Sequence, residues 1–179
     1  METKINKSVL ALTQGDITRE QSEAIVNAAN NSLLGGGGVD GAIHRAGGPA
    51  ILAECKKIGG CETGQAVITT GGNLPAQYVI HTVGPVYMDG NSGEPELLAN
   101  SYRNSLTLAL SKGMKTVAFP SISTGIYGYP IEEAANIALS TVIEFLTQHT
   151  GIKIVRFVLF DQPTYSIYEK VLKKLTAHQ

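Results

Sequence analysis

Four consecutive glycines, residues 35–38, lie between an apolar segment and a helical pattern. The apolar segment ends near Asn30, and the helical pattern begins at Val39, Asp40 and Gly41. Because glycine has no Cβ, its backbone N–H groups approach an anion closely, and a following helix N-terminus adds favourable partial charge. The alternative is a plain flexible loop, but a run of glycines loses much entropy on ordering. The pattern favours a phosphate-binding loop over residues 35–41.

A second loop of small residues follows another apolar segment, at residues 119–130. Its glycines expose backbone N–H groups, and Ser123 and Thr124 add hydroxyl donors. Tyr127 stands between two glycines and is well placed to cover a sugar. The alternative is a Ser/Gly turn that caps the next helix. Because neither loop contains Lys or Arg, we expect a diphosphate held by amides, with any reaction elsewhere on the ligand rather than phosphoryl transfer.

A third polar segment, Gln14-Gly15-Asp16-Ile17-Thr18, follows the first apolar run. Thr18 and Gln21 have the spacing of a capping box, and Asp16 is also a residue type that caps helices. The functional alternative is that the Asp16 carboxylate accepts a hydrogen bond from an adenine amine, with Ile17 packed nearby.

Other motifs are weak or absent. Gly36-x-Gly38-x-x-Gly41 matches a dinucleotide fingerprint, but residues separate it from the preceding strand and Asp40 would place a carboxylate in the phosphate turn. A nicotinamide-dependent oxidoreductase is therefore a remote reading, since Glu62, the candidate ribose-binding acid, lies in a polar turn. The P-loop ending and the Gly-x-Ser-x-Gly elbow do not occur in the sequence, which disfavours a triphosphatase and a serine hydrolase.

The histidines and cysteines give no metal-ligand spacing, and the sequence predicts neither a metal site nor a cofactor. His81 lies in a strand pattern and is predicted to be a hydrogen-bonded core histidine rather than a base. His44 falls on the helix after the glycines and is not predicted to be a ligand. Cys55 and Cys61 are interpreted as reduced, apolar residues.

Alternating strand and helix patterns must position these loops. Apolar runs predict strands at residues 9–12, 24–29, 65–70, 78–83, 116–119 and 154–160. Helical spacing of apolar residues predicts helices at residues 97–110, 131–146 and 167–175, besides the one after the glycines. This order predicts an α/β fold with a mixed or mostly parallel sheet and helices on both faces. In such a sheet, two loops at strand carboxyl ends define a ligand crevice.

Length and composition restrict the class of protein. The 179 residues fit one domain, residues 1–179, with 43% hydrophobic and 16% charged residues. Fourteen basic and fifteen acidic residues leave a net charge of −1, which argues against electrostatic binding of nucleic acid. No segment reaches the ~20 apolar residues of a membrane span. We expect a soluble, cytoplasmic protein, with nothing that demands more than a monomer.

Together these segments resemble the macro domain family, and more specifically its MacroD-type branch. The matching residues are Gly15–Thr18, Ile25–Asn30, Gly35–Arg45, His81–Pro85 and Phe119–Gly128. The resemblance covers most of the chain, in the family's order. It implies a three-layer α/β/α sandwich that binds ADP-ribose, removes ADP-ribose from acidic side chains of proteins and deacetylates O-acetyl-ADP-ribose.

The resemblance also implies roles for individual residues. Asp16 and Ile17 would receive the adenine, with Phe160 as a further neighbour. Asn30 would bind the distal ribose. The diphosphate would lie between two sets of residues: Gly37, Gly38 and Val39 on one side, and Ser123, Thr124, Gly125, Ile126 and Tyr127 on the other.

Asp40 would stand beside the scissile ester, and the mechanism expected from the resemblance needs no metal. Asp40 would act as a general base or orient the attacking water, while Asn30 fixes the ribose. Two alternatives remain open: Asp40 as the N-cap of the helix at residues 41–46, and the whole protein as a reader that binds ADP-ribose on mono-ADP-ribosylated proteins without turnover. The presence of both Asn30 and Asp40 favours the enzyme.

Overall fold

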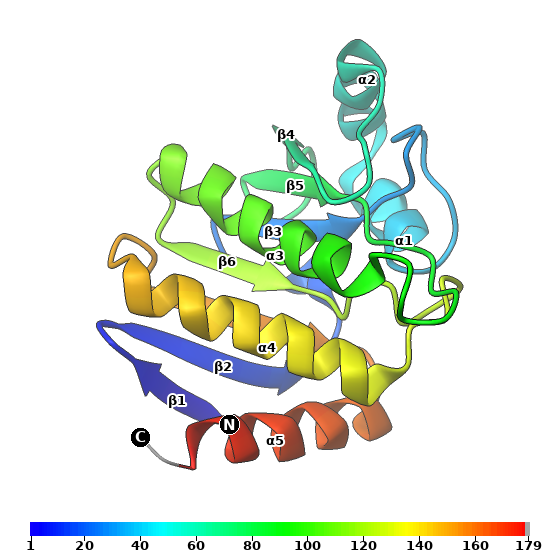
Figure 1. The fold of residues 1–179 in the computed structure, drawn as a ribbon. Helices are drawn as coiled ribbons and strands as arrows, with labels where there is room; N and C mark the ends of the chain where they lie inside the picture. Colours follow the sequence, from blue (N-terminus) through cyan, green and yellow to red (C-terminus); the bar gives the residue numbers. More distant parts are fainter. Residues whose placement is uncertain (178–179) are drawn as a thin grey trace.

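A seven-stranded sheet lies between two layers of helices in the computed structural model, which describes residues 1–177 (Figure 1). The strand order is β1-β2-β7-β6-β3-β5-β4. Strands β2, β7, β6, β3 and β5 are parallel, and the edge strands β1 and β4 are antiparallel to their neighbours. The bounds are β1 Glu2–Ile5, β2 Ser8–Gln14, β3 Ala24–Ala28, β4 Ala66–Thr70, β5 Tyr78–Thr82, β6 Thr116–Phe119 and β7 Ile154–Leu159.

Helices cover both faces of this sheet, so the chain is a three-layer α/β/α sandwich. On one face lie α3 (Glu94–Ser111), α4 (Ile131–Gln148) and α5 (Gln162–Thr176); α3 and α4 run side by side in Figure 1. On the other face lie the 3-10 helix η1 (Ile17–Arg19), α1 (Gly38–Gly47) and α2 (Pro49–Ile58). Among residues 1–177, no helix is both long and apolar enough to cross a bilayer.

Two hydrophobic cores result from the alternation of side chains along the strands. In β3, Val26 points into the core under α3, α4 and α5, whereas Ile25 points into the core under α1 and α2. The first core is centred on packed aromatic rings: Phe119 and Phe157 stack with centroids 5.5 Å apart, and the tilted ring of Tyr102 lies 5.1 Å from Phe119. These rings lie just below the carboxyl edge of the parallel strands.

The six strands predicted from the sequence are confirmed, and the helices at 97–110, 131–146 and 167–175 lie within α3, α4 and α5. The sequence analysis did not predict β1 or α2. β1 is a polar edge strand whose first residue, Glu2, is exposed. α2 follows Gly47 and Gly48 and begins with Pro49, a sequence that ends helices more often than it starts them, yet proline is accommodated at the first position of a helix.

A buried carboxylate fixes the loop that enters α3. The backbone N–H groups of Met88, Asp89, Gly90 and Ser92 donate to the Glu94 carboxylate at 2.6–3.0 Å. Hydrogen bonds from its own backbone N–H and from those of the loop lower the pKa of Glu94 to about 2. The charged carboxylate therefore organises this loop.

We predict that Glu94→Gln destabilises the protein in a pH-dependent way. A carboxylate whose pKa is depressed in the folded state stabilises above its ordinary value of 4.5, and this contribution is lost as the pH falls towards 2. Urea unfolding should therefore show the largest wild-type advantage near neutral pH and a shrinking advantage below pH ~4.5. The exposed Glu144→Gln serves as control; a pH-independent difference for Glu94→Gln contradicts the prediction.

Candidate functional site

A cavity of about 350 Å³ opens at the carboxyl edge of the parallel strands. It lies where the segments after β3 and β6, neighbours in the sheet, face the start of α1. Its size is in the range of small-molecule sites. The lining residues are Ala28, Ala29, Asn30, Gly36, Gly37, Gly38, Val39, Asp40, Gly84, Ser121, Ile122, Ser123, Gly125, Ile126 and Tyr127.

The first wall of the cavity is the start of α1. Gly37 is the cap residue, and the helix begins at Gly38, whose φ of 57° is left-handed and suits glycine. The first N–H groups of a helix have no acceptor within it, so those at this end face the cavity edge free for a ligand. Gly41 brings the turn close, because a Cβ there would lie 2.5 Å from the Gly36 carbonyl oxygen. The glycines therefore shape a helix start whose free N–H groups lie at the cavity.

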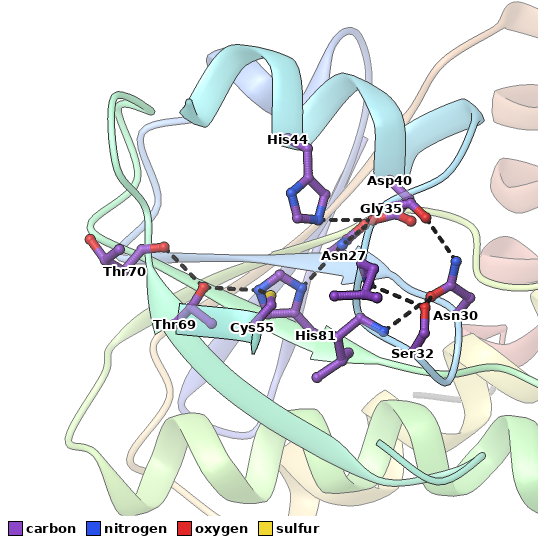
Figure 2. A network of polar contacts seen from close by, with 12 residues as sticks. Asn27, Asn30, Ser32, Gly35, Asp40, His44, Cys55, Thr69, Thr70 and His81 are labelled. Carbon is purple, nitrogen blue, oxygen red and sulfur yellow. Dashed lines mark hydrogen bonds and ion pairs between the residues drawn. The ribbon is translucent and has the colours of Figure 1, made fainter. Parts of the chain in front are cut away.

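Asn30 holds the loop that precedes these glycines. Its Nδ2 donates to the Gly35 carbonyl at 2.9 Å, and its Oδ1 accepts from Ser32 Oγ at 2.8 Å and from the Leu33 N–H at 3.1 Å (Figure 2). Nδ2 retains a second proton, and a Cβ on Gly36 would lie 3.5 Å from this nitrogen. Asn30 thus both fixes the loop and keeps a donor beside the cavity.

The second wall is the loop after β6. Ser123 has a left-handed φ of 69°, a conformation that is strained for a residue with a Cβ. The loop is tied down through carbonyls: Tyr129 N–H donates to Ser123, and Tyr87 N–H donates to Tyr127. The N–H groups of residues 123–127 have no acceptor within residues 1–177. A row of free amides therefore lines this side of the cavity.

Core residues anchor this second loop from below. The hydroxyl of the buried Tyr102 accepts from the Ile122 N–H at 2.9 Å. Thr124 Oγ1 donates within the loop, to Ser121, and Thr124 does not line the cavity. Gly84 leaves room for Ser123, because a Cβ there would lie 2.2 Å from Ser123 Oγ. The wall is therefore rigidly seated on the aromatic core.

Asp40 is a buried carboxylate at the cavity edge, 5% exposed. Its Oδ1 accepts from Asn27 Nδ2 at 2.8 Å and lies 3.4 Å from His44 Nε2. Its Oδ2 has no hydrogen bond to any described residue, and a Cβ on Gly36 would lie 3.2 Å from it. The alternative of Asp40 as a helix N-cap is wrong, because α1 begins two residues earlier, with Gly37 as its cap. One oxygen is anchored and the other is available.

A buried polar network stands behind Asp40 (Figure 2). Asn27 Nδ2 also contacts His81 Nδ1 at 3.1 Å, and His81 Nε2 contacts Thr69 Oγ1 at 2.9 Å. Burial, with His44 nearby, lowers the pKa of His81 to about 3. His81 is therefore a neutral core histidine with hydrogen-bond partners, as the sequence analysis predicted, and it is also connected to Asp40.

Four residues predicted to contact a ligand lie outside the cavity lining: Thr124, described above, and Asp16, Ile17 and Phe160. Asp16 caps η1: its carboxylate accepts from Thr18 N and Oγ1, and these hydrogen bonds lower the pKa of Asp16. The predicted capping box at Thr18 is wrong, because its hydroxyl donates to Asp16 instead. Ile17 is buried in the core. Phe160 follows β7 and is 82% exposed. Asp16 and Phe160 follow adjacent parallel strands.

Several cavity residues were missing from the predicted set: Ala28, Ala29, Gly84, Ser121 and Ile122. Most of them contribute backbone, which a search for reactive side chains does not detect. Gly84 carries a signal in the sequence, as a glycine directly after a buried strand. Asn27, His81 and Thr69 come from three strands, and only the sheet register brings them together.

Charge in the cavity comes from the backbone and from Asp40. None of the described residues that line it is Lys or Arg. Within residues 1–177, no group of three or more His, Cys, Asp or Glu side chains is arranged to hold a metal ion. The cavity therefore offers free amides for an anion and one carboxylate at its edge.

The sequence of this chain is similar to those of macro domain proteins. The profile of one family, described as "Macro domain", matches residues 26–138. The chain is 60% identical to a macro domain-containing protein of Chlorobaculum tepidum, over 89% of this chain and 92% of that protein. It is 56% identical to the "O-acetyl-ADP-ribose deacetylase 1" of Pantoea vagans, over 91% of this chain and 98% of that protein.

Solved structures agree in fold. The Oceanobacillus iheyensis macrodomain with ADP superposes with a TM-score of 0.97 at 48% identity, covering 100% of this chain and 97% of that one. A mutant of the same macrodomain has been solved with ADPR.

We predict that Gly41→Ala disrupts the first wall. The added methyl group would lie 2.5 Å from the Gly36 carbonyl oxygen, so loop and helix must separate, at a cost of ~1–3 kcal/mol in the free energy of unfolding. The matched control is Gly37→Ala, whose Cβ meets nothing within 4 Å at an ordinary φ of −94°. Equal thermal unfolding midpoints for the two variants would contradict the prediction.

Proposed function

This chain belongs to the macro domain family, and on that basis we propose that it binds ADP-ribose and hydrolyses esters at the distal ribose. The proposed substrates are O-acetyl-ADP-ribose and proteins carrying ADP-ribose on Asp or Glu side chains. The observation that carries the proposal is Asp40, a buried carboxylate at the edge of an amide-lined cavity, with one oxygen anchored and the other free.

The diphosphate would lie between the two walls. Both walls present backbone N–H groups without protein acceptors in the described chain, and such groups bind phosphate oxygens through short, charge-assisted hydrogen bonds. No Lys or Arg of the described chain lines the cavity to assist cleavage of the diphosphate, so the diphosphate would serve as a binding handle, the part of the ligand that is held but not cleaved. This arrangement supports a reaction at another part of the ligand.

The adenine and the distal ribose would extend to opposite ends of this handle. Asp16 and Phe160 follow β2 and β7, which are adjacent, and Gly15 N–H donates to the Leu159 carbonyl at 2.9 Å. In the proposed complex, the free Asp16 oxygen accepts from the adenine amine and the exposed Phe160 ring packs on the base. The distal ribose would then reach Asn30 and Asp40 beside the glycine loop.

Hydrolysis would depend on a water held by the free oxygen of Asp40. The carboxylate either accepts a proton from this water or orients it, and Asn30 Nδ2 holds the ribose for attack. A reader of ADP-ribose needs no such carboxylate. The 56% identity to a protein named O-acetyl-ADP-ribose deacetylase supports the enzyme.

We predict that ADP-ribose binds more tightly than AMP or NAD. AMP lacks the second phosphate that would face the free amides of the loop after β6, and NAD adds a nicotinamide at the distal ribose, next to Asp40. Isothermal titration calorimetry should give the tightest dissociation constant for ADP-ribose, with AMP weaker by at least about tenfold. Equal affinities for AMP and ADP-ribose would contradict the proposed diphosphate site.

We predict that Asp40→Asn separates binding from turnover. The substitution keeps the size of the side chain but removes its charge, so the rate of ester hydrolysis should fall by about 10²–10⁴-fold. The dissociation constant for ADP-ribose should change by less than about threefold, because the carboxylate acts in the transition state. The readouts are deacetylation of O-acetyl-ADP-ribose and calorimetry with ADP-ribose.

Two outcomes would contradict this assignment. Turnover that survives within a factor of a few in Asp40→Asn would show that Asp40 is not catalytic. Complete retention of the label by a glutamate-ADP-ribosylated protein, together with unhydrolysed O-acetyl-ADP-ribose, at stoichiometric wild-type protein would favour a reader.

A further inference from the structure

We propose that His81 and Thr69 are positioning residues, which fix the Asp40 carboxylate for hydrolysis through Asn27. Neither residue lines the cavity, and the inference rests on the proposed function of Asp40. It assigns a catalytic consequence to a polar network that could otherwise be taken as part of the core.

The network crosses three neighbouring strands on the face covered by α1 and α2. Asn27 of β3 pairs directly with His81 of β5 in the parallel register. Thr69 of β4 lies two residues along from Val67, the direct partner of His81, at the diagonal position where side chains still meet. Figure 2 shows the path from Thr70 to Asp40. All three side chains are at most 2% exposed, so water does not compete for these contacts.

With Asp40 ionised, one arrangement of protons satisfies every contact. The carboxylate only accepts, so Asn27 must direct its Nδ2 to Asp40 Oδ1, and that same nitrogen donates its other proton to His81 Nδ1. His81 must then carry its proton on Nε2 and donate it to Thr69 Oγ1. Thr69 in turn donates to the Thr70 carbonyl at 3.0 Å, which also only accepts.

The Asp40 carboxylate at one end of this hydrogen-bonded path and the Thr70 carbonyl at the other can only accept, so together they determine which atom donates in each contact. If His81 carried its proton on Nδ1, two donors would face each other at 3.1 Å, the distance from His81 Nδ1 to Asn27 Nδ2. Rotating the Asn27 side-chain amide by 180° would remove this clash between donors. It would, however, place the Asn27 oxygen 2.8 Å from Asp40 Oδ1, where two acceptors would repel each other. The His81 tautomer thus decides whether Asp40 is held or repelled.

The other titratable groups around His81 come from the two covering helices. From α1, Asp40 and His44 face the network, and the His44 and His81 ring centroids are 6.3 Å apart. From α2, Cys55 Sγ lies 3.8 Å from His81 Nε2, and burial raises the pKa of this thiol to about 11. Glu54 accepts from the Thr70 N–H. The neutral Cys55 sulfur is only a weak acceptor at 3.8 Å, so the Thr69 hydroxyl at 2.9 Å is the stronger acceptor for a proton on His81 Nε2.

Thr69→Val tests the far end of the path. The substitution keeps the shape of the side chain and removes the hydroxyl that fixes the His81 tautomer. We expect kcat for O-acetyl-ADP-ribose to fall by at least about tenfold, with the dissociation constant for ADP-ribose within about twofold. Thr69→Ser should restore kcat. The control is Thr82→Val, which removes an equally buried strand hydroxyl that donates to the Gln65 carbonyl at 2.7 Å and should leave kcat unchanged.

His81 variants divide the path into its two halves. The oxygen of an Asn side chain takes the place of His Nδ1, whereas the nitrogen of a Gln side chain takes the place of Nε2. His81→Asn keeps the acceptor for Asn27 and should retain more of the wild-type kcat than His81→Gln, which keeps only the contact to Thr69. A merely structural role predicts that kcat follows thermal stability in both variants, and that result would overturn the proposal.

A readout independent of activity separates this inference from the proposed function. Proton–nitrogen correlation spectra of the wild-type imidazoles should show His81 neutral with its proton on Nε2, and Thr69→Val should shift it towards Nδ1. A wild-type His81 protonated on Nδ1 overturns the inference, whatever the activity. If wild-type protein hydrolyses no ester while His81 has the expected tautomer, the proposed function fails, and the catalytic role inferred here fails with it.

Discussion

The burial of one carboxylate constrains the whole site. Asp40 is withdrawn from water, and a buried charge is tolerated only where donors replace its hydration. The donor is Asn27, whose Nδ2 also contacts the neutral imidazole of His81 and is thereby held in place. A strand of the sheet, β3, therefore supplies the hydrogen-bond donor that replaces the lost hydration of Asp40. This explains the buried polar side chains of Asn27 and His81 within strands that contribute mainly hydrophobic residues to the core.

The cavity around this carboxylate is made chiefly of backbone. Parallel strands bring the ends of β3 and β6 to one edge, and the segments that follow them turn their amides towards each other. Such a surface recognises an anion by geometry rather than by cationic side chains. The conformational strain at Ser123 and the close packing at Gly41 are local costs of this geometry, offset by the aromatic core beneath.

Part of this arrangement could be predicted from the sequence. A run of four glycines and a segment of small residues, each between a strand and a helix, predict the two loops, because the residues that form each loop are adjacent in the sequence. The alternation of β-branched runs with helical patterns predicts the layered fold. In contrast, α2 was not predicted, because Pro49 at its start is a residue type that usually interrupts helices. The partnership of Asn27, His81 and Thr69 depends on the register of three strands, which no local pattern encodes. Burial of His81 was predictable; its connection to Asp40 was not.

The strand order has a consequence for how the molecule is made. Within residues 1–177, β7 is the last strand, yet it lies between β2 and β6 and is the only strand that joins the β1–β2 hairpin to the rest of the sheet. A nascent chain emerging from the ribosome therefore carries two separate sheet fragments until residues 154–159 have been synthesised. Such non-local pairing is slow and leaves unpaired strand edges exposed in the meantime. Completion of the fold, and with it of the sheet edge that carries Asp16 and Phe160, waits until β7 has been synthesised.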